Sequence, residues 1–160
     1  MTGESNFILD ADGNKETYFP VVVVDTSFFM SAIFCSFTND EVKSAADFIE
    51  ELISKNGQIV VPQIFWFEVG NVLLNAAKPK RNGDAARITK KQVLQIENLI
   101  NELPIYTDLQ LDIQTRMRIR ELAQEYDLSY YDASYLELSQ RKNLVLKTLD
   151  KDLQSAANHT

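Results

Sequence analysis

The sequence predicts an α/β protein in which helices cover both faces of a central, mainly parallel sheet of four to five strands. Two short β-branched runs, PVVVVD at residues 20–25 and QIVVP at 58–62, are typical of strands buried on both faces. Stretches with apolar residues at helical spacing alternate with these and later strands. Because parallel strands are joined by crossovers that are usually helical, the alternation favours a three-layer α/β/α arrangement.

Start and stop signals place the elements along the chain. We expect Asn56-Gly57 to close the second helix, Pro62 to open the helix after the second strand, and Ser129 to cap a helix that ends before Asn143. The expected order after the first strand is a helix from residue 28, a helix over 39–55, a strand over 58–62, a helix over 62–74, a helix over 90–102, a strand over 104–108, helices over 112–126 and 130–141, a strand over 144–148 and a short helix over 151–157.

One domain is expected over residues 20–160, preceded by an N-terminal extension over residues 1–19. In the extension, FILD and KETYF flank ADGN, and its Asp12-Gly13 pair is a common hairpin-turn signal. A small hairpin before the main domain is therefore predicted.

The composition excludes several kinds of site. The chain has one histidine, His159 near its end, and one cysteine, Cys35, so it cannot assemble a His/Cys zinc site by itself, and Ser–His–Asp or Cys–His catalysis is disfavoured. A net charge of −7 disfavours a non-specific coat for duplex DNA but is compatible with clustered active-site acids. We find no membrane-length apolar stretch and no signal-peptide pattern, and therefore expect a cytoplasmic protein without membrane contact.

Four carboxylates are predicted to lie at one edge of the sheet. Asp25 ends the first strand, Asp150 follows the last strand, and Asp132 and Glu68 lie in the first two turns of helices. The carboxyl ends of parallel strands and the starts of the following helices share the edge where open α/β folds bind ligands. Carboxylates without nitrogen or sulfur ligands suit Mg²⁺ or Mn²⁺.

Each acid also has a purely structural interpretation. Asp25 and Asp150 fit helix N-caps, and Asp132 fits the positive end of a helix. Glu68 is harder to explain, because its neighbours in IFWFEVGNVLL are apolar and a carboxylate that faces a core needs a partner or a metal.

Three stretches of the sequence resemble the PIN-domain ribonucleases, most closely the VapC-like toxins of type II toxin–antitoxin modules. They are VVVVDTSFF, VPQIFWFEVGNVL and LSYYDASYLELSQRKNLVLKTLDKDL, within a resemblance over roughly residues 20–157. The resemblance implies a three-layer PIN-like fold and a Mg²⁺- or Mn²⁺-dependent endoribonuclease that hydrolyses RNA phosphodiester bonds. By that resemblance, the catalytic acids are Asp25, Glu68, Asp132 and Asp150.

The hypothesis for the metal is that Asp25, Asp132 and Asp150 hold it, with Glu68 and Asp152 as further candidate ligands. Thr26, Ser27 and Thr148 are the expected supporting hydroxyls, and Thr148 matches a hydroxyl that is usual in the family. Four like charges so close together would repel without metal, so at least one pKa should be raised.

A basic connection between two predicted helices is most simply a solvated loop, and the alternative is an RNA-steering arm near the acids. Its candidate RNA-contacting residues are Lys78, Lys80, Arg81, Arg87, Lys90 and Lys91. The family resemblance further implies a homodimer and a small antitoxin protein that places a basic side chain in the acidic site.

Other functions remain open at the level of sequence. One alternative is a catalytically degenerate PIN-like module that binds RNA or protein, and another is a housekeeping PIN nuclease without an antitoxin. Receiver domains and haloacid-dehalogenase phosphatases also place an aspartate after the first strand, but Ser27 stands where the phosphatase needs a second aspartate.

Overall fold

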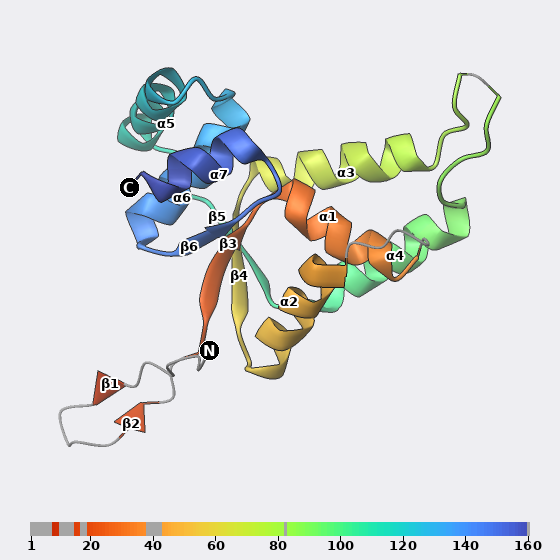
Figure 1. Ribbon diagram of the computed structural model, residues 1–160, viewed down its shortest axis with the longest axis horizontal. Coiled ribbons are helices and arrows are strands. Elements are labelled where there is room, and N and C mark those ends of the chain that lie inside the picture. The colour runs from red at the N-terminus through yellow and green to blue at the C-terminus, as the bar shows by residue number, and fades with distance from the viewer. Residues whose placement is uncertain (1–7, 10–14, 17–18, 38–42, 82, 160) are drawn as a thin grey trace.

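A four-stranded parallel sheet lies at the centre of the computed structural model, which describes residues 8–9, 15–16, 19–37, 43–81 and 83–159 (Figure 1). The strand order is β5-β4-β3-β6, and every neighbouring pair is parallel. The sheet strands are β3 (Val21–Val24), β4 (Gln58–Pro62), β5 (Ile105–Asp108) and β6 (Val145–Lys147). The parallel sheet predicted from the β-branched runs is confirmed.

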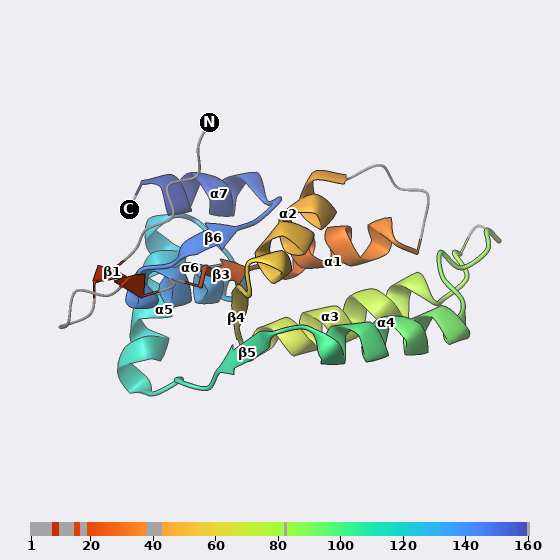
Figure 2. The same ribbon diagram turned by 90° about the horizontal axis from the view of Figure 1, so that it is seen from below.

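Helices cover both faces of this sheet, which confirms the three-layer α/β/α fold. In Figure 2, α5, α6 and α7 lie on one side of the strands, and α1, α2, α3 and α4 lie on the other. The helices are α1 (Thr26–Cys35), α2 (Lys43–Ser54), α3 (Ile64–Ala76), α4 (Lys90–Glu102), α5 (Ile113–Glu125), α6 (Tyr130–Lys142) and α7 (Lys151–Asn158).

The core lies on both faces of the central strand. Val23 and Val24 of β3 are completely buried, as are Phe29 of α1 and Leu136 of α6. Burial on two faces explains why β3 is a continuous apolar run rather than an alternating one. Within the described residues, no helix is both long and apolar enough to cross a membrane.

Most predicted caps are present. Asp25, Ser129 and Asp150 each accept a hydrogen bond from the backbone of the helix that follows. Asn56 and Asn143, both with φ near +50°, follow α2 and α6 in the left-handed conformation that ends helices. The side-chain oxygens of aspartate and serine thus fix where three helices start at the sheet edge.

Pro62 does not open α3, contrary to the prediction. It is the last residue of β4, where its Cα pairs with that of Asp108 in β5, and α3 begins at Ile64. A proline lacks the N–H that would continue a strand ladder, so it suits the final position of a strand as well as the first of a helix.

A short antiparallel pair precedes the sheet in sequence. Strand β1 (Ile8–Leu9) pairs with β2 (Lys15–Glu16), with Leu9 opposite Lys15. The predicted turn over residues 11–14 lies outside the described residues, as do residues 39–42 of the predicted second helix.

Candidate active site

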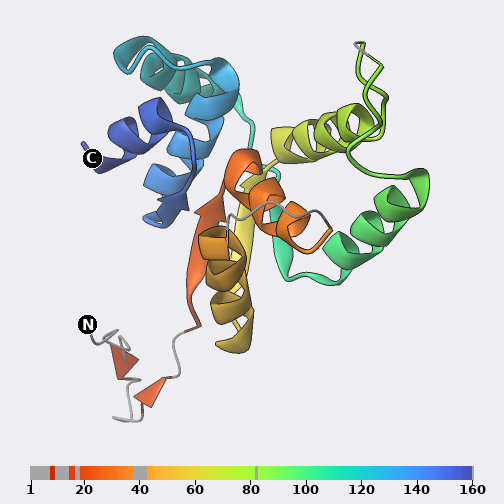
Figure 3. The same ribbon diagram turned by 45° about the vertical axis from the view of Figure 1, so that its right-hand side comes forward.

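Asp25 lies at the junction of β3 and α1, where the starts of α1, α3 and α7 converge (Figures 1 and 3). It is 5% exposed, and its carboxylate is held by donors from two segments. Oδ1 accepts from the Phe28 amide at 2.8 Å, the Ser27 hydroxyl reaches both oxygens at 2.8 and 2.9 Å, and Thr148 donates to Oδ2 at 2.6 Å. The carboxylate is therefore fixed in orientation.

Burial raises the pKa of Asp25 above its ordinary value, even though Thr148, Phe28 and Ser27 donate to it and oppose the rise. The negative charge of Asp132 on α6 raises this pKa further. These two acids, 107 residues apart in sequence (132 minus 25), are therefore close enough to interact electrostatically. The predicted increase in pKa from clustered acids thus has burial as its main cause and charge repulsion as a minor one.

Glu68 lies in the second turn of α3 and is bound by two buried hydroxyls. Its Oε2 accepts from Thr26 at 2.9 Å and from the Tyr135 hydroxyl at 2.5 Å, and these two hydroxyl oxygens are 2.8 Å apart. Tyr135 is 1% exposed. Burial and the adjacent Glu68 carboxylate raise the pKa of Tyr135 well above its ordinary value, so the phenol remains a proton donor at neutral pH.

Tyr135 was missed from the sequence, although a signal was available. It follows Asp132 by three residues on α6, and residues at that spacing share one face of a helix. A tyrosine one turn after an active-site aspartate was therefore a candidate for the same edge. Its neighbours in YDASYLELS are apolar enough to suggest only a core position.

Asp132 and Asp150 are each held through one oxygen. Ser129 donates to Oδ2 of Asp132 at 2.5 Å, and the amides of Asp152 and Leu153 donate to Oδ1 of Asp150 at 2.9 and 2.8 Å. The Asp150 amide also donates to the Thr148 hydroxyl at 2.9 Å. Thr148 thus connects the segment that carries Asp150 directly to Asp25.

One oxygen on each of three acids is left for a ligand. Among the described residues, Oε1 of Glu68, Oδ1 of Asp132 and Oδ2 of Asp150 have no hydrogen-bond partner, whereas the other oxygen of each is bound by protein donors. Such half-bound carboxylates fit a hard divalent cation, which takes oxygen ligands and retains water. The chemistry of these donors is therefore the chemistry that Mg²⁺ or Mn²⁺ prefers.

The acids do not form a closed cage. No three Asp, Glu, His or Cys side chains in the described part of the chain are grouped closely enough to hold a metal ion. Each acid is instead held by its own hydroxyl or amide donors. Asp152 lies in the first turn of α7 with an exposed side chain, and its role as a ligand stays a prediction.

A family model of the PIN domain matches residues 22–158, nearly the whole of the described domain. The chain belongs to the PIN-domain family. PIN domains are generally nucleases, so this chain is assigned to the nucleases. All four predicted catalytic acids lie within the matched residues.

Two solved structures share this fold at low sequence identity. VapC20 of Mycobacterium tuberculosis, described as a Sarcin–Ricin loop cleaving toxin, is 14% identical, with a TM-score of 0.58 over 84% of this chain and 94% of that one. PAE2754 of Pyrobaculum aerophilum is 18% identical, with a TM-score of 0.56 over 86% of this chain and 78% of that one. The comparison with curated proteins gave no significant match.

The basic connection of this PIN domain lies away from the acids, contrary to the expected place of the arm. It begins after Ala76, eight residues beyond Glu68 on α3, which is about 12 Å along a helix axis. Figures 1 and 3 show it projecting beyond the end of α3 that is remote from the sheet. The Arg87 guanidinium lies 4.1 Å from the Phe34 ring centroid. RNA contact by its six basic residues stays a prediction that requires a substrate longer than the site itself.

Proposed function

We propose that this PIN domain is a Mg²⁺- or Mn²⁺-dependent endoribonuclease and the toxin of a toxin–antitoxin pair. The observation that carries the proposal is the set of half-bound carboxylates on Glu68, Asp132 and Asp150 around a buried, rigidly held Asp25. This set lies at the carboxyl edge of a parallel sheet, where α/β proteins bind ligands.

The chain's own residues have distinct roles in the proposed reaction. A bound divalent cation would lower the pKa of a coordinated water and neutralise charge on the scissile phosphodiester. Asp25, oriented by Ser27 and Thr148, would hold the cation together with Asp132 and Asp150. Oε1 of Glu68 is the oxygen available to orient the attacking water and to take up its proton.

Proposed partners follow from the family and the charge. RNA is the proposed substrate, and the toxin role adds a small antitoxin whose basic side chain would occupy the acidic site. A net charge of −7 is compatible with a basic inhibitor. Homodimerisation and a cytoplasmic location complete the proposal.

Cleavage of labelled single-stranded RNA tests this function. We expect cleavage with Mg²⁺ or Mn²⁺, its loss in excess EDTA, and a decrease of at least about 100-fold in Asp25→Asn and Asp132→Asn. The matched control is Asp127→Asn, which changes an exposed aspartate in a left-handed conformation that asparagine also adopts. Cleavage that survives both active-site changes would exclude the catalytic assignment. RNA binding without any cleavage would favour the degenerate binding module.

A further inference from the structure

A preformed pocket of about 230 Å³ lies beside the acids at the same edge of the sheet. Its walls include Pro62 and Asp108, the last residues of β4 and β5. Asp25 and Asp150 follow the ends of β3 and β6, and β3 is the neighbour of β4 in the sheet. Helices α3 and α6 each carry a pocket residue next to an acid. Phe67 of the pocket precedes Glu68 on α3, and Tyr131 of the pocket precedes Asp132 on α6. A polymer bound at the acids can therefore extend into the pocket.

Exposed aromatic rings line the pocket. Phe67 is 75% exposed and Tyr131 is 56% exposed, and Tyr130 lies between Tyr131 and the helix cap at Ser129. Aromatic faces at a groove stack on bases of single-stranded nucleic acid, and each such contact contributes to binding whichever base is present. Rings this exposed contribute little to the core. Contact with a ligand therefore explains aromatic residues at these positions better than core packing does.

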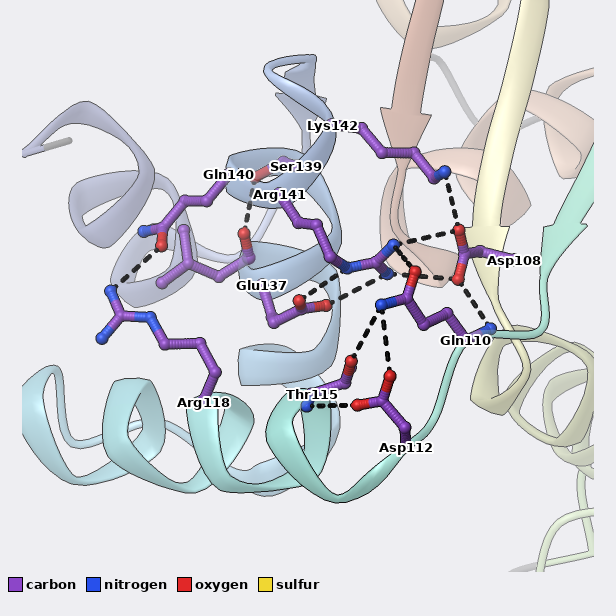
Figure 4. Close-up of polar contacts among 11 residues, drawn as sticks. Asp108, Gln110, Asp112, Thr115, Arg118, Glu137, Ser139, Gln140, Arg141 and Lys142 are labelled. Carbon is purple, nitrogen blue, oxygen red and sulfur yellow. Dashed lines mark hydrogen bonds and ion pairs between the residues drawn. The ribbon is translucent and has the colours of Figure 1, made fainter.

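One side of the pocket is a saturated ion-pair network that keeps its shape (Figure 4). Arg141 donates to both oxygens of Glu137, to both oxygens of Asp108 and to the Gln110 carbonyl oxygen. Lys142 adds a second cation at 3.0 Å from Asp108. The charges of two acids and two bases cancel, so this wall presents no net charge to a ligand. All the N–H groups of the Arg141 guanidinium already donate within the network, so none is left for a ligand.

A cation with no ion-pair partner stands beside the pocket. Arg116 of α5 is exposed, and its guanidinium donates at 2.7 Å to the carbonyl of Leu111, a residue that lines the pocket. No carboxylate among the described residues pairs with it, unlike Arg118, which is paired with Glu121. A fixed arginine without an acid is well suited to contact a phosphate.

We propose that the pocket binds one unpaired nucleobase of the RNA strand whose phosphodiester lies at the acids, with Phe67 and Tyr131 stacking on the base and Arg116 contacting a flanking phosphate. This inference rests on the proposed ribonuclease function. Since an apolar cavity of about 150 Å³ holds benzene, a pocket of about 230 Å³ has room for a larger planar ring. The apolar walls and aromatic rim supply the stacking surfaces, and Arg116 supplies the charge.

The test measures binding without cleavage, using fluorescence anisotropy of a short 2′-O-methyl RNA and of the same strand with one abasic position. We expect Phe67→Ala and Tyr131→Ala each to weaken binding of the intact strand about 5- to 150-fold, the range for losing one base–aromatic stack. Wild type should bind the abasic strand more weakly by a similar factor, and the alanine variants should distinguish the two strands less. Arg116→Gln should weaken both strands.

Tyr106→Ala is the matched control, because Tyr106 is also an exposed aromatic, 53% exposed on β5, but does not line this pocket. It should bind RNA as wild type does. Equal affinity of the wild type for intact and abasic strands would overturn the proposal, as would unchanged binding in both alanine variants. If those variants lose self-association in sedimentation while RNA binding is unchanged, the pocket is a protein interface and the proposal is also overturned. If binding depends on the base but labelled unmodified RNA is not cleaved, only the proposed nuclease function is contradicted.

Discussion

Tyr135 of α6 donates a hydrogen bond to Glu68 of α3 across 67 residues of sequence. The same Glu68 oxygen accepts from Thr26, which directly follows Asp25, so three segments meet at one carboxylate. This arrangement holds one oxygen of Glu68 in place and leaves the other without a hydrogen-bond partner among the described residues. Tyr135 is a positioning residue, because its effect on the site is transmitted through Glu68.

Tyr135→Phe should therefore impair activity more than stability. The change removes one hydroxyl and leaves the buried ring, so the free energy of unfolding should fall by about 1 kcal/mol. Partners that orient metal ligands are typically worth 10- to 100-fold in activity or metal affinity, and we expect a decrease of that size in kcat with little change in KM. Tyr106→Phe, which removes an exposed hydroxyl, is the control. An unchanged kcat in Tyr135→Phe would show that Thr26 alone orients Glu68.

The raised pKa of Asp25 predicts a pH dependence of stability. Burial favours the protonated form in the folded state, so the contribution of Asp25 to stability is present below its unfolded value of 3.8 and is lost as the pH rises through the folded value. Asp25→Asn cannot ionise and should lack this loss. In metal-free buffer, urea unfolding from pH 3 to pH 7 should show the variant gaining stability relative to wild type. If the difference in unfolding free energy between Asp25→Asn and the wild type stays constant with pH, the expected ionisation of Asp25 is contradicted.

Arg141 should be needed for the stability of the ion-pair network. The side chains of Asp108 and Glu137 are only 8% and 5% exposed, and Arg141→Met leaves Glu137 without its cation and Asp108 with Lys142 alone. Breaking a buried pair by removing one partner costs several kcal/mol, so we expect a loss of about 3 kcal/mol and a decrease in Tm of roughly 10 °C. Arg120→Met, on the exposed part of α5, should change stability by less than about 0.5 kcal/mol in the same thermal scans. Equal effects of the two changes would show that the network does not stabilise the fold.

The sequence predicted those features that depend on local chemistry. Residues 22–24 are buried in the central strand and Asp25 caps a helix, and both follow from residue type and order. Pro62 was assigned to the wrong element, because a proline suits the end of a strand and the start of a helix alike. The partners of Glu68 could not be predicted, because they depend on how α3 and α6 approach each other in space.

The basic connection shows a second limit of the sequence. Its six cations suggested an arm beside the acids, but the direction of α3 carries them to the other end of the helix. Arg116, an exposed cation beside the pocket, lies on α5, where arginines at every second position point in different directions around the helix. Charge content is visible in a sequence, whereas its place relative to a site depends on helix direction.

Direct titration of Mn²⁺ into the metal-free protein by isothermal calorimetry shows whether Asp25, Asp132 and Asp150 form a divalent-metal site. We expect saturable binding to the wild type, affinity weakened at least about 10-fold in Asp132→Asn, and unchanged affinity in Asp127→Asn. Absence of binding to the wild type, or equal affinity of the wild type and Asp132→Asn, would contradict a metal site at these acids.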